Sequence, residues 1–323
     1  MKHINILFLG AAKRVSLVER FIEAGRKLNI KLGIFSCEKD DGFYPVSTYA
    51  KILKTPKFHT GKFQGWLARA LKKYAIKIVI PSVDPATIAL SKFALRNRAK
   101  HPSTFFAVSE YSLCRAMFDK KLAYKFFKEH SIPTIPNTFN KFPKVIKPVK
   151  GSASKGITIV NSPRQLRDFS NSCVMKNYII GDYINGTETT VDFYVSPDRG
   201  FIGAVFRNRL EISDGEVMVA RTKIPRAEEQ DILNKAIGIK GWAGCITLQY
   251  IMDKNGKVYI IEINPRFGGG ATCAIEAGLD MPLYILSEYL KIDFTGPDKI
   301  KNIFMTRARR DFFIRGNDGD GVL

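Results

Sequence analysis

The segment from Ile246 to Gly270 constrains the fold more than any other part of this sequence. It reads ITLQYIMDKNGKVYIIEINPRFGGG, with two apolar or alternating runs separated by Asp-Lys-Asn-Gly. An Asn-Gly pair between two such runs is the strongest short-range signal for a β-hairpin. We therefore expect two antiparallel strands, with Gln249 on the first and with Glu262 and Asn264 on the second.

Three oxygen-bearing side chains of this hairpin form a candidate metal site. Glu262 and Asn264 are two residues apart, so a strand directs both side chains to one face. Gln249 can lie across from them. A carboxylate and two amide oxygens suit Mg²⁺, which proteins hold with few ligands of their own plus substrate phosphates. Arg266 follows, and its planar guanidinium can bind a phosphate. The alternative for this segment alone is an ordinary hairpin with a hydrogen-bonded polar cluster.

The first third of the chain alternates between strand and helix patterns. Short apolar runs lie at 4–10, 31–37, 76–82 and 104–109, and helical spacing of apolar residues separates them. This alternation implies a parallel sheet with helices on both faces, and hence an α/β fold. The GAAKR sequence that follows the first strand does not match the G-x-G-x-x-G pattern of dinucleotide-binding loops.

A loop of small residues lies between two β-type runs, KVIKP and GITIV, in the second third of the chain. This loop, residues 151–156, reads GSASKG. Small residues let backbone N–H groups close around phosphate oxygens, and Lys147 and Lys155 add positive charge. The loop is not a Walker A motif, and most Gly/Ser loops of this kind are simple turns. Before it, we expect one helix from Leu113 to His130 that contains Asp119 and Lys120.

The hydrophobic content, the cysteines and the net charge of the chain limit the class of protein it can be. The chain has 323 residues, 45% of them hydrophobic, and no apolar run approaches the roughly 18 residues of a membrane span. Its five cysteines form no C-x-x-C pair, so we expect no zinc site, no disulfide framework and a cytoplasmic location. The net charge is +21, and residues 1–100 hold 20 Lys/Arg against 6 Asp/Glu. We interpret this excess as a solvated basic face rather than a nucleic-acid site, with an anionic partner or a membrane surface left open.

Taken together, these motifs resemble the ATP-grasp superfamily, and in particular single-module proteins similar to the carbamoyl-phosphate synthase large subunit. Five elements occur in that superfamily's order: Asp119-Lys120, the KP motif with its Gly/Ser loop, a hinge before Glu188, Gln249, and E-x-N-P-R. The resemblance implies a Rossmann-like domain at 1–108, an ATP-grasp domain at 109–290 with a lid at about 119–177, and a tail at 291–323. The ATP-grasp fold consists of two α+β subdomains that grip ATP.

The resemblance also implies a role for each matching residue. Lys120 and Lys147 would contact ATP phosphates, and Arg266 would steady the transferred phosphate. Glu188 would hold the ribose hydroxyls. The hinge departs from the pattern of many relatives, which carry a glutamate-type residue where Gly181-Asp182 stands here. The remaining implied contacts are the lid loop with Gly151, Ser152, Ser154, Lys155 and Gly156, the adenine hinge with Ile180, Asp182, Tyr183 and Ile184, and the ligands of Mg²⁺ (or Mn²⁺), Gln249, Glu262 and Asn264.

The implied activity is ATP-dependent ligation of a carboxylate to an amine or thiol through an acyl phosphate. An ATP-binding protein without ligase activity is one alternative, and phosphorylation of a small carboxylate as in carbamoyl-phosphate synthase is a less favoured one. Arg207, Arg209 and Arg221 are candidates to hold a substrate carboxylate, and equally to be solvated or ion-paired arginines. The expected partners are small-molecule substrates, with a homodimer left open and nucleic acid not expected.

Overall fold

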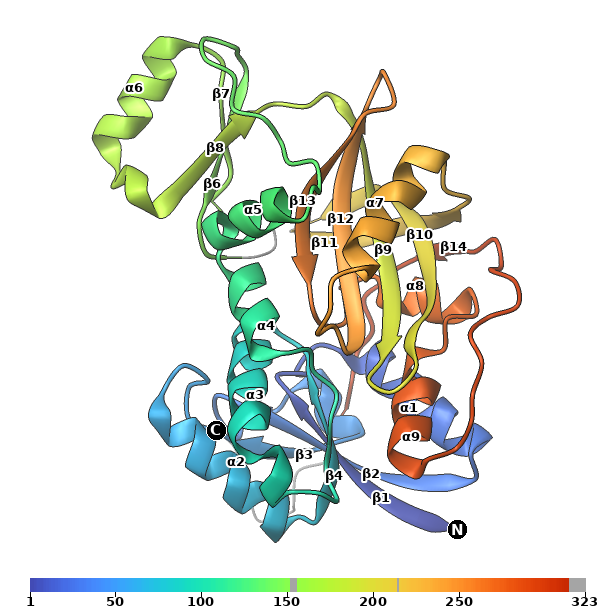
Figure 1. Ribbon diagram of the computed structural model, residues 1–323. Helices are drawn as coiled ribbons and strands as arrows, with labels where there is room; N and C mark the ends of the chain where they lie inside the picture. Colours follow the sequence, from blue (N-terminus) through green and yellow to red (C-terminus); the bar gives the residue numbers. More distant parts are fainter. Residues whose placement is uncertain (152–155, 214, 314–323) are drawn as a thin grey trace. The chain divides into compact units, whose positions relative to one another are not determined.

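The computed structural model describes residues 1–151, 156–213 and 215–313. The chain divides into two units, which Figure 1 shows in sequence colours. Unit 1 comprises residues 1–107, 282–294 and 308–313, and unit 2 comprises residues 108–281 and 295–307. Among the described residues, no helix combines the length and the apolar character that crossing a membrane requires.

Unit 1 is built on the predicted parallel sheet, which has the strand order β3-β2-β1-β4-β5 (Figure 1). Ile6 to Leu9 are fully buried, as expected for a parallel strand covered on both faces. The strand β3 was not predicted from the sequence, because two of its four residues, KILK, are lysines and no apolar run is visible. The strands are β1 (Lys2–Leu9), β2 (Ile30–Glu38), β3 (Lys51–Lys54), β4 (Ile76–Pro81) and β5 (Phe105–Phe106).

The helices of unit 1 lie on both faces of this sheet. Connections β1–β2 and β2–β3 run one way across the sheet and β3–β4 and β4–β5 run the other way. Because such crossovers are right-handed, α1 covers one face and α2 and α3 cover the other. The amide of Gln64 on α2 donates to the carbonyl of Ala89 on α3 over 3.1 Å, so these two helices are neighbours. The helices are α1 (Val15–Lys27), α2 (Gly61–Lys73), α3 (Asp84–Asn97) and α9 (Met281–Leu290), the last from its second residue on.

Unit 2 contains two antiparallel sheets. The larger has the strand order β13-β12-β9-β10-β11-β14, and the smaller has the order β7-β6-β8. The hairpin predicted from Asp-Lys-Asn-Gly is confirmed as β12 and β13, and Gly256 closes its turn by donating to the carbonyl of Asp253 over 3.1 Å. The segment predicted as a tail contributes β14. The strands are β6 (Lys144–Pro148), β7 (Thr158–Val160), β8 (Tyr178–Asp182), β9 (Gly186–Ser196), β10 (Gly200–Ser213), β11 (Glu216–Lys223), β12 (Gly244–Asp253), β13 (Val258–Asn264) and β14 (Phe304–Thr306).

The single helix predicted from Leu113 to His130 is wrong, because two helices meet at Asp119. The carboxylate of Asp119 accepts from the backbone N–H groups of Lys121 and Leu122 at 3.0 and 3.2 Å. These hydrogen bonds cap the N-terminus of the second helix, so a new helix begins after Asp119. Lys120 thereby becomes the first residue of that helix. The helices of unit 2 are α4 (Tyr111–Phe118), α5 (Lys120–Glu129), α6 (Pro163–Ser172), α7 (Ala227–Ile237) and α8 (Ala271–Glu276).

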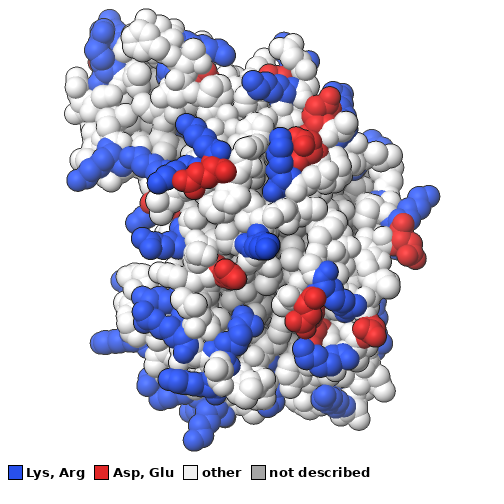
Figure 2. Space-filling model, viewed as in Figure 1, with Lys and Arg blue, Asp and Glu red and all other residues white. Residues whose placement is uncertain are grey.

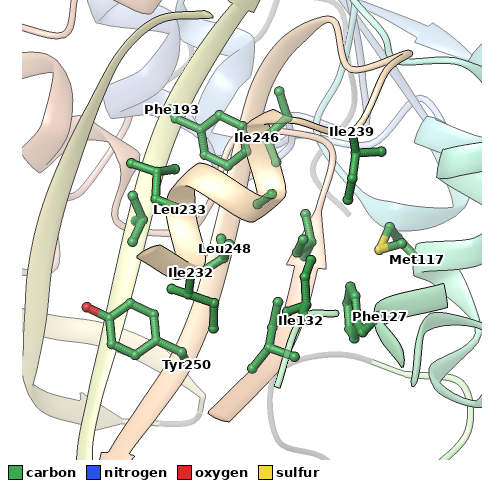
Figure 3. Close-up of a cluster of buried hydrophobic side chains, with 14 of the residues drawn as sticks. Met117, Phe127, Ile132, Phe193, Ile232, Leu233, Ile239, Ile246, Leu248 and Tyr250 are labelled. Atoms are coloured by element: carbon green, nitrogen blue, oxygen red, sulfur yellow. The ribbon is translucent and has the colours of Figure 1, made fainter. Parts of the chain in front are cut away.

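One face of the larger sheet forms the core of unit 2 (Figure 3). Alternate residues of the strands point to this face, among them Phe193 of β9 and Ile246 and Leu248 of β12. They pack against side chains from α4, α5 and α7, including Met117 and Phe127. Because side chains alternate along a strand, the residues between these apolar ones belong to the opposite face.

Candidate functional site

The second face of the larger sheet of unit 2 is polar, and most of the predicted site residues lie on it. Gln249 of β12 is directly opposite Glu262 of β13 and Thr190 of β9. Thr247, two residues earlier on β12, is directly opposite Asn264 and Asp192. Residues that face one another across antiparallel strands share a face. The polar face thus joins seven residues of the hairpin and its neighbour β9 with two residues of β10, namely Glu188, Thr190, Asp192, Arg207, Arg209, Thr247, Gln249, Glu262 and Asn264.

The three candidate metal ligands lie together on this face. The side-chain amide of Asn264 donates to Glu262 Oε1 over 2.6 Å, and Gln249 is the cross-strand partner of Glu262. Gln249 and Glu262 are half-buried, so their oxygens are partly accessible. In the described part of the chain no three His, Cys, Asp or Glu side chains group as a metal site. The hairpin set has a single carboxylate and two amides, and these hard oxygens fit Mg²⁺.

The two predicted phosphate lysines come from other elements. Lys147 lies near the end of β6, and Lys120 begins α5. Burial lowers the pKa of Lys147, while the charges of Glu262 and Glu188 raise it and that of Lys120 lowers it. The four charged groups that the sequence predicts for one ATP site are therefore electrostatic neighbours. Lys120 also donates from Nζ to the carbonyl of Gly151 over 2.9 Å.

The two ends of the predicted lid loop have backbone geometry that favours glycine. Gly151 and Gly156 have φ angles of +129° and +74°, in the region that favours glycine. A Cβ at Gly156 would also lie 2.9 Å from Cγ of Pro148. Ser152, Ser154 and Lys155, the other predicted lid residues, lie outside the described residues.

The predicted adenine hinge, residues 180–184, begins within β8 and is held by hydrogen bonds to nearby residues. The carboxylate of Asp182 accepts from Lys144 Nζ at 3.1 Å and from Thr138 N and Oγ1 at 3.0 and 2.7 Å. Burial raises the pKa of Asp182, but these hydrogen bonds and Lys144 outweigh it, so the net shift is downward. The backbone N–H of Asp182 donates to Pro136 and that of Tyr183 to Pro143. Any hinge contact of Asp182 is thus left to its carbonyl rather than to its side chain.

The other residues of the predicted hinge make fewer hydrogen bonds than Asp182 does. Ile180 pairs with Ile146 within the smaller sheet, and Tyr183 is exposed. Ile184 lies between β8 and β9, and its backbone N–H has no acceptor among the described residues. Hydrogen-bonding capacity toward a ligand therefore remains at the end of the hinge.

Glu188, the predicted ribose ligand, has an ion-pair partner. Arg209 Nη1 donates to Glu188 Oε1, with about one-third of the Glu188 side chain exposed. Sequence analysis named Arg209 only as a candidate for a substrate carboxylate. A strand register was needed to find the pair, because Glu188 and Arg209 are 21 residues apart.

Arg207 is the buried member of the three candidate arginines. Its Nε donates to the carboxylate of Asp192 over 2.7 Å, and both side chains are almost fully buried. Thr247 Oγ1 donates to the other oxygen of Asp192 over 2.8 Å. A Cβ on Gly270 would lie only 2.7 Å from Nη1 of Arg207, so the Gly-rich end of the hairpin segment rests directly on this guanidinium. Arg221, in contrast, is exposed and has a weak contact of 3.5 Å with Asn302.

Tyr124 is a further neighbour of the candidate metal site that the sequence did not indicate. This residue of α5 is half-buried, and burial together with the charge of Glu262 raises the pKa of its hydroxyl to about 12. Its phenol is therefore a neutral neighbour of the candidate metal site. The helical spacing of α5 gave no signal for this contact, because it depends on how the helix packs against β13.

Arg266 lies directly after the metal ligands. Its backbone N–H donates to the carbonyl of Asn264 over 2.8 Å, and Nη1 donates to the carbonyl of Phe267 over 3.3 Å. Its own carbonyl lies 3.3 Å from Thr247 Oγ1. The turn after β13 is thus tied to the Asp192 and Arg207 pair beneath it.

Comparison with known families identifies this architecture. Residues 117–270 match the family model for the ATP-grasp domain, a range that includes Lys120, Lys147, Glu188 and the hairpin. The match spans 154 of the 323 residues and supports the predicted resemblance to the ATP-grasp superfamily, and the predicted fold class is confirmed.

Curated relatives match over less than half of the chain. A D-alanine–D-alanine ligase of Buchnera aphidicola is 32% identical over 135 residues, which are 38% of this chain and 44% of that ligase. The corresponding ligase of Aquifex aeolicus is 22% identical over 138 residues, or 39% of this chain and 46% of the ligase. The matched part is less than half the length of each of these relatives.

Solved structures share the fold over almost the whole chain. N5-carboxyaminoimidazole synthetase from Staphylococcus aureus, complexed with ADP, has a TM-score of 0.73 at 14% identity and covers 95% of this chain and 83% of its own. The biotin carboxylase domain of Hydrogenobacter thermophilus 2-oxoglutarate carboxylase, with MgADP, has a TM-score of 0.71 at 15% identity, with 93% and 73% coverage. An L-amino acid ligase from Bacillus licheniformis has a TM-score of 0.65 at 17% identity, with 90% and 75% coverage.

Proposed function

We propose that this protein is an ADP-forming, ATP-dependent carboxylate–amine ligase. The observation that carries the proposal is the shared electrostatic environment of Lys147, Glu262, Glu188 and Lys120, four residues from four different elements. A nucleoside triphosphate needs cations beside its phosphates and a carboxylate for its metal ion. The two lysines and Glu262 supply these groups.

The proposed reaction has two steps. An oxygen of the substrate carboxylate attacks the γ-phosphorus of ATP, the bond to the β–γ bridging oxygen breaks, and ADP leaves. The amine then attacks the carbon of the acyl phosphate, loses a proton, and expels phosphate to leave an amide. Phosphoryl transfer depends on positioning and charge neutralisation more than on a protein nucleophile. The charged residues described above fit that requirement.

Different residues of this chain would bind different parts of ATP. Lys120 and Lys147 would bind the ATP phosphates, and Arg266 would hold the phosphoryl group that moves. Glu188 would bind ribose hydroxyls while Arg209 fixes its orientation. Hinge backbone groups of residues 180–184 would hydrogen-bond adenine, with Asp182 contributing its carbonyl.

Gln249, Glu262 and Asn264 would hold Mg²⁺, with Mn²⁺ as an alternative. When bound, the ion supplies positive charge that neutralises the phosphates. The MgADP in the biotin carboxylase structure supports this cofactor. Because Asn264 donates to Glu262, the amide also sets the orientation of the carboxylate before any ion arrives.

Amino acids are the first substrate class to test. The matched relatives are D-alanine–D-alanine ligases, and an L-amino acid ligase shares the fold. Both names describe enzymes that act on amino acids, which carry the required carboxylate and amine. We extend that substrate class to this chain as part of the proposal.

The test is ADP release from Mg·ATP in the presence of pooled amino acids. We expect wild type to release ADP only when substrate is present. Glu262→Ala should lower the rate about a hundredfold or more, since a metal-binding carboxylate contributes several kcal/mol. Glu228→Ala is the matched control, because Glu228 is an exposed carboxylate on α7. Full turnover in Glu262→Ala would overturn the site assignment, and absence of turnover with every amino acid despite ATP binding would overturn the substrate class.

A further inference from the structure

The outer surface of α2 and α3 in unit 1 carries a dense set of positive charges. We call it the basic face. On α2 the exposed residues follow one stripe, with Lys62, Arg69 and Lys72 at helical spacing. Since α2 and α3 are neighbours on the same face of the sheet, their exposed sides form one surface. The basic face consists of Lys62, Arg69, Lys72, Lys73, Lys92, Arg96, Arg98 and Lys100, of which Lys92 is half-buried and the others are exposed.

Almost no negative charge accompanies these residues. Residues 51–100 contain 12 Lys/Arg and one acidic residue, Asp84. Among the described residues, no carboxylate forms an ion pair with any member of the basic face. Figure 2 shows Lys and Arg without Asp or Glu over the part of unit 1 where Figure 1 labels α2. The positive field of this surface is therefore not neutralised by the chain itself.

Helix stability accounts for only part of this pattern. Lys72 and Lys73 lie in the last turn of α2 and Arg96 in the last turn of α3, where cations are favourable for the helix dipole. Lys62 lies in the first turn of α2, where a cation is unfavourable. Eight like charges on one surface also repel one another, which costs stability. A partner that offsets this repulsion explains the pattern better than helix stability does.

We propose that the basic face binds the anionic phospholipid surface of a bilayer. The face has five lysines and three arginines, and lysine is a hydrated point charge on a flexible stem, which suits a diffuse surface charge. Leu95, 70% exposed on α3 beside Arg96, is a side chain that can enter the headgroup region. Proteins that bind a DNA duplex use amide and hydroxyl side chains beside Arg and Lys, and the exposed residues of α2 and α3 include no amide or hydroxyl side chain. The basic face belongs to unit 1, whereas the residues of the proposed ATP site belong to unit 2.

The test is sedimentation of the full chain with phosphatidylcholine vesicles, with and without phosphatidylserine. We expect binding only to the phosphatidylserine vesicles, and a steep fall as salt is raised. The triple variant Lys62→Glu/Arg69→Glu/Lys72→Glu should lower the affinity at least tenfold. The control is Lys128→Glu/Lys240→Glu/Lys254→Glu, which makes the same change in net charge at exposed lysines of unit 2 and should change the affinity less than twofold.

Three results would overturn the proposal. Equal weakening in both triple variants would mean that only net charge matters. Tighter binding to a random DNA duplex than to the vesicles at the same salt would assign the face to nucleic acid. Absence of vesicle binding by wild type at physiological salt would show that the basic face does not bind an anionic bilayer. Should the α2 variant fail to fold by circular dichroism, Lys92→Glu/Arg96→Glu/Lys100→Glu, on α3 and the turn that follows it, makes the same comparison.

Discussion

Gly270 lies against the guanidinium of Arg207, so closely that a Cβ at this glycine would be 2.7 Å from Nη1. The contact matters because Arg207 cannot move away. It is buried and bonded to Asp192, which also accepts from Thr247. The Gly-rich segment after the metal ligands is therefore supported by a rigid polar pair.

This contact predicts the effect of a single methyl group. Gly270→Ala should lower the free energy of unfolding by about 1–3 kcal/mol, the usual cost of overpacking, and should reduce ADP release. Gly269→Ala is the control, since no atom lies within 4 Å of a Cβ at that position. Urea unfolding of both variants measures the difference. Equal stability of the two variants would mean that Arg207 yields easily.

We expect Lys147 to lower the stability of the folded protein and to strengthen ATP binding. Burial lowers its pKa, so the folded protein holds this proton less tightly than the unfolded chain does. Stability associated with Lys147 should then rise as pH increases from the lowered folded pKa toward the ordinary lysine pKa. Lys147→Met removes the buried charge, and we expect a higher melting temperature at neutral pH together with weaker ATP binding. A variant that melts lower and binds ATP normally would contradict both assignments.

Glu229 gives a pH dependence of the opposite sign. Burial raises its pKa, but donors from Arg226, Lys223 and Tyr250 outweigh burial and leave the pKa below 4.5. Its contribution to stability is present above the unfolded pKa and is lost as pH falls through the folded value. Glu229→Gln should cost about 3–5 kcal/mol at neutral pH, because it leaves Lys223 without its partner. Thermal melts between neutral and acidic pH should show a smaller acid loss in the variant than in wild type.

The sequence predicted those features that depend on neighbours along the chain. The Asp-Lys-Asn-Gly turn specified the hairpin, and the two-residue spacing of Glu262 and Asn264 specified their common face. The direct pairing of Gln249 with Glu262 also required a register shift between Gln249 and Tyr250, which the turn does not specify. The alternation of strands and helices likewise specified the parallel sheet of unit 1.

Contacts between distant segments could not be predicted in the same way. The pairing of Arg209 with Glu188 depends on the register between β9 and β10, which no short-range pattern fixes. The approach of Tyr124 to Glu262 depends on helix packing. The break at Asp119 was missed because apolar spacing continues across it, although Asp is a favoured helix cap. The strand β3 was missed because it is short and half charged.

The central claim is that the polar face of the larger sheet in unit 2, together with Lys147 of β6, binds ATP with Mg²⁺. The most direct test is calorimetric titration of the wild-type chain and of Lys147→Met with ATP, each with and without Mg²⁺. We expect wild type to bind ATP more tightly with Mg²⁺, and Lys147→Met to bind about tenfold to a hundredfold more weakly, as expected for loss of a buried charge-assisted contact. Equal affinity of the two proteins, or binding by wild type that does not respond to Mg²⁺, would contradict this account.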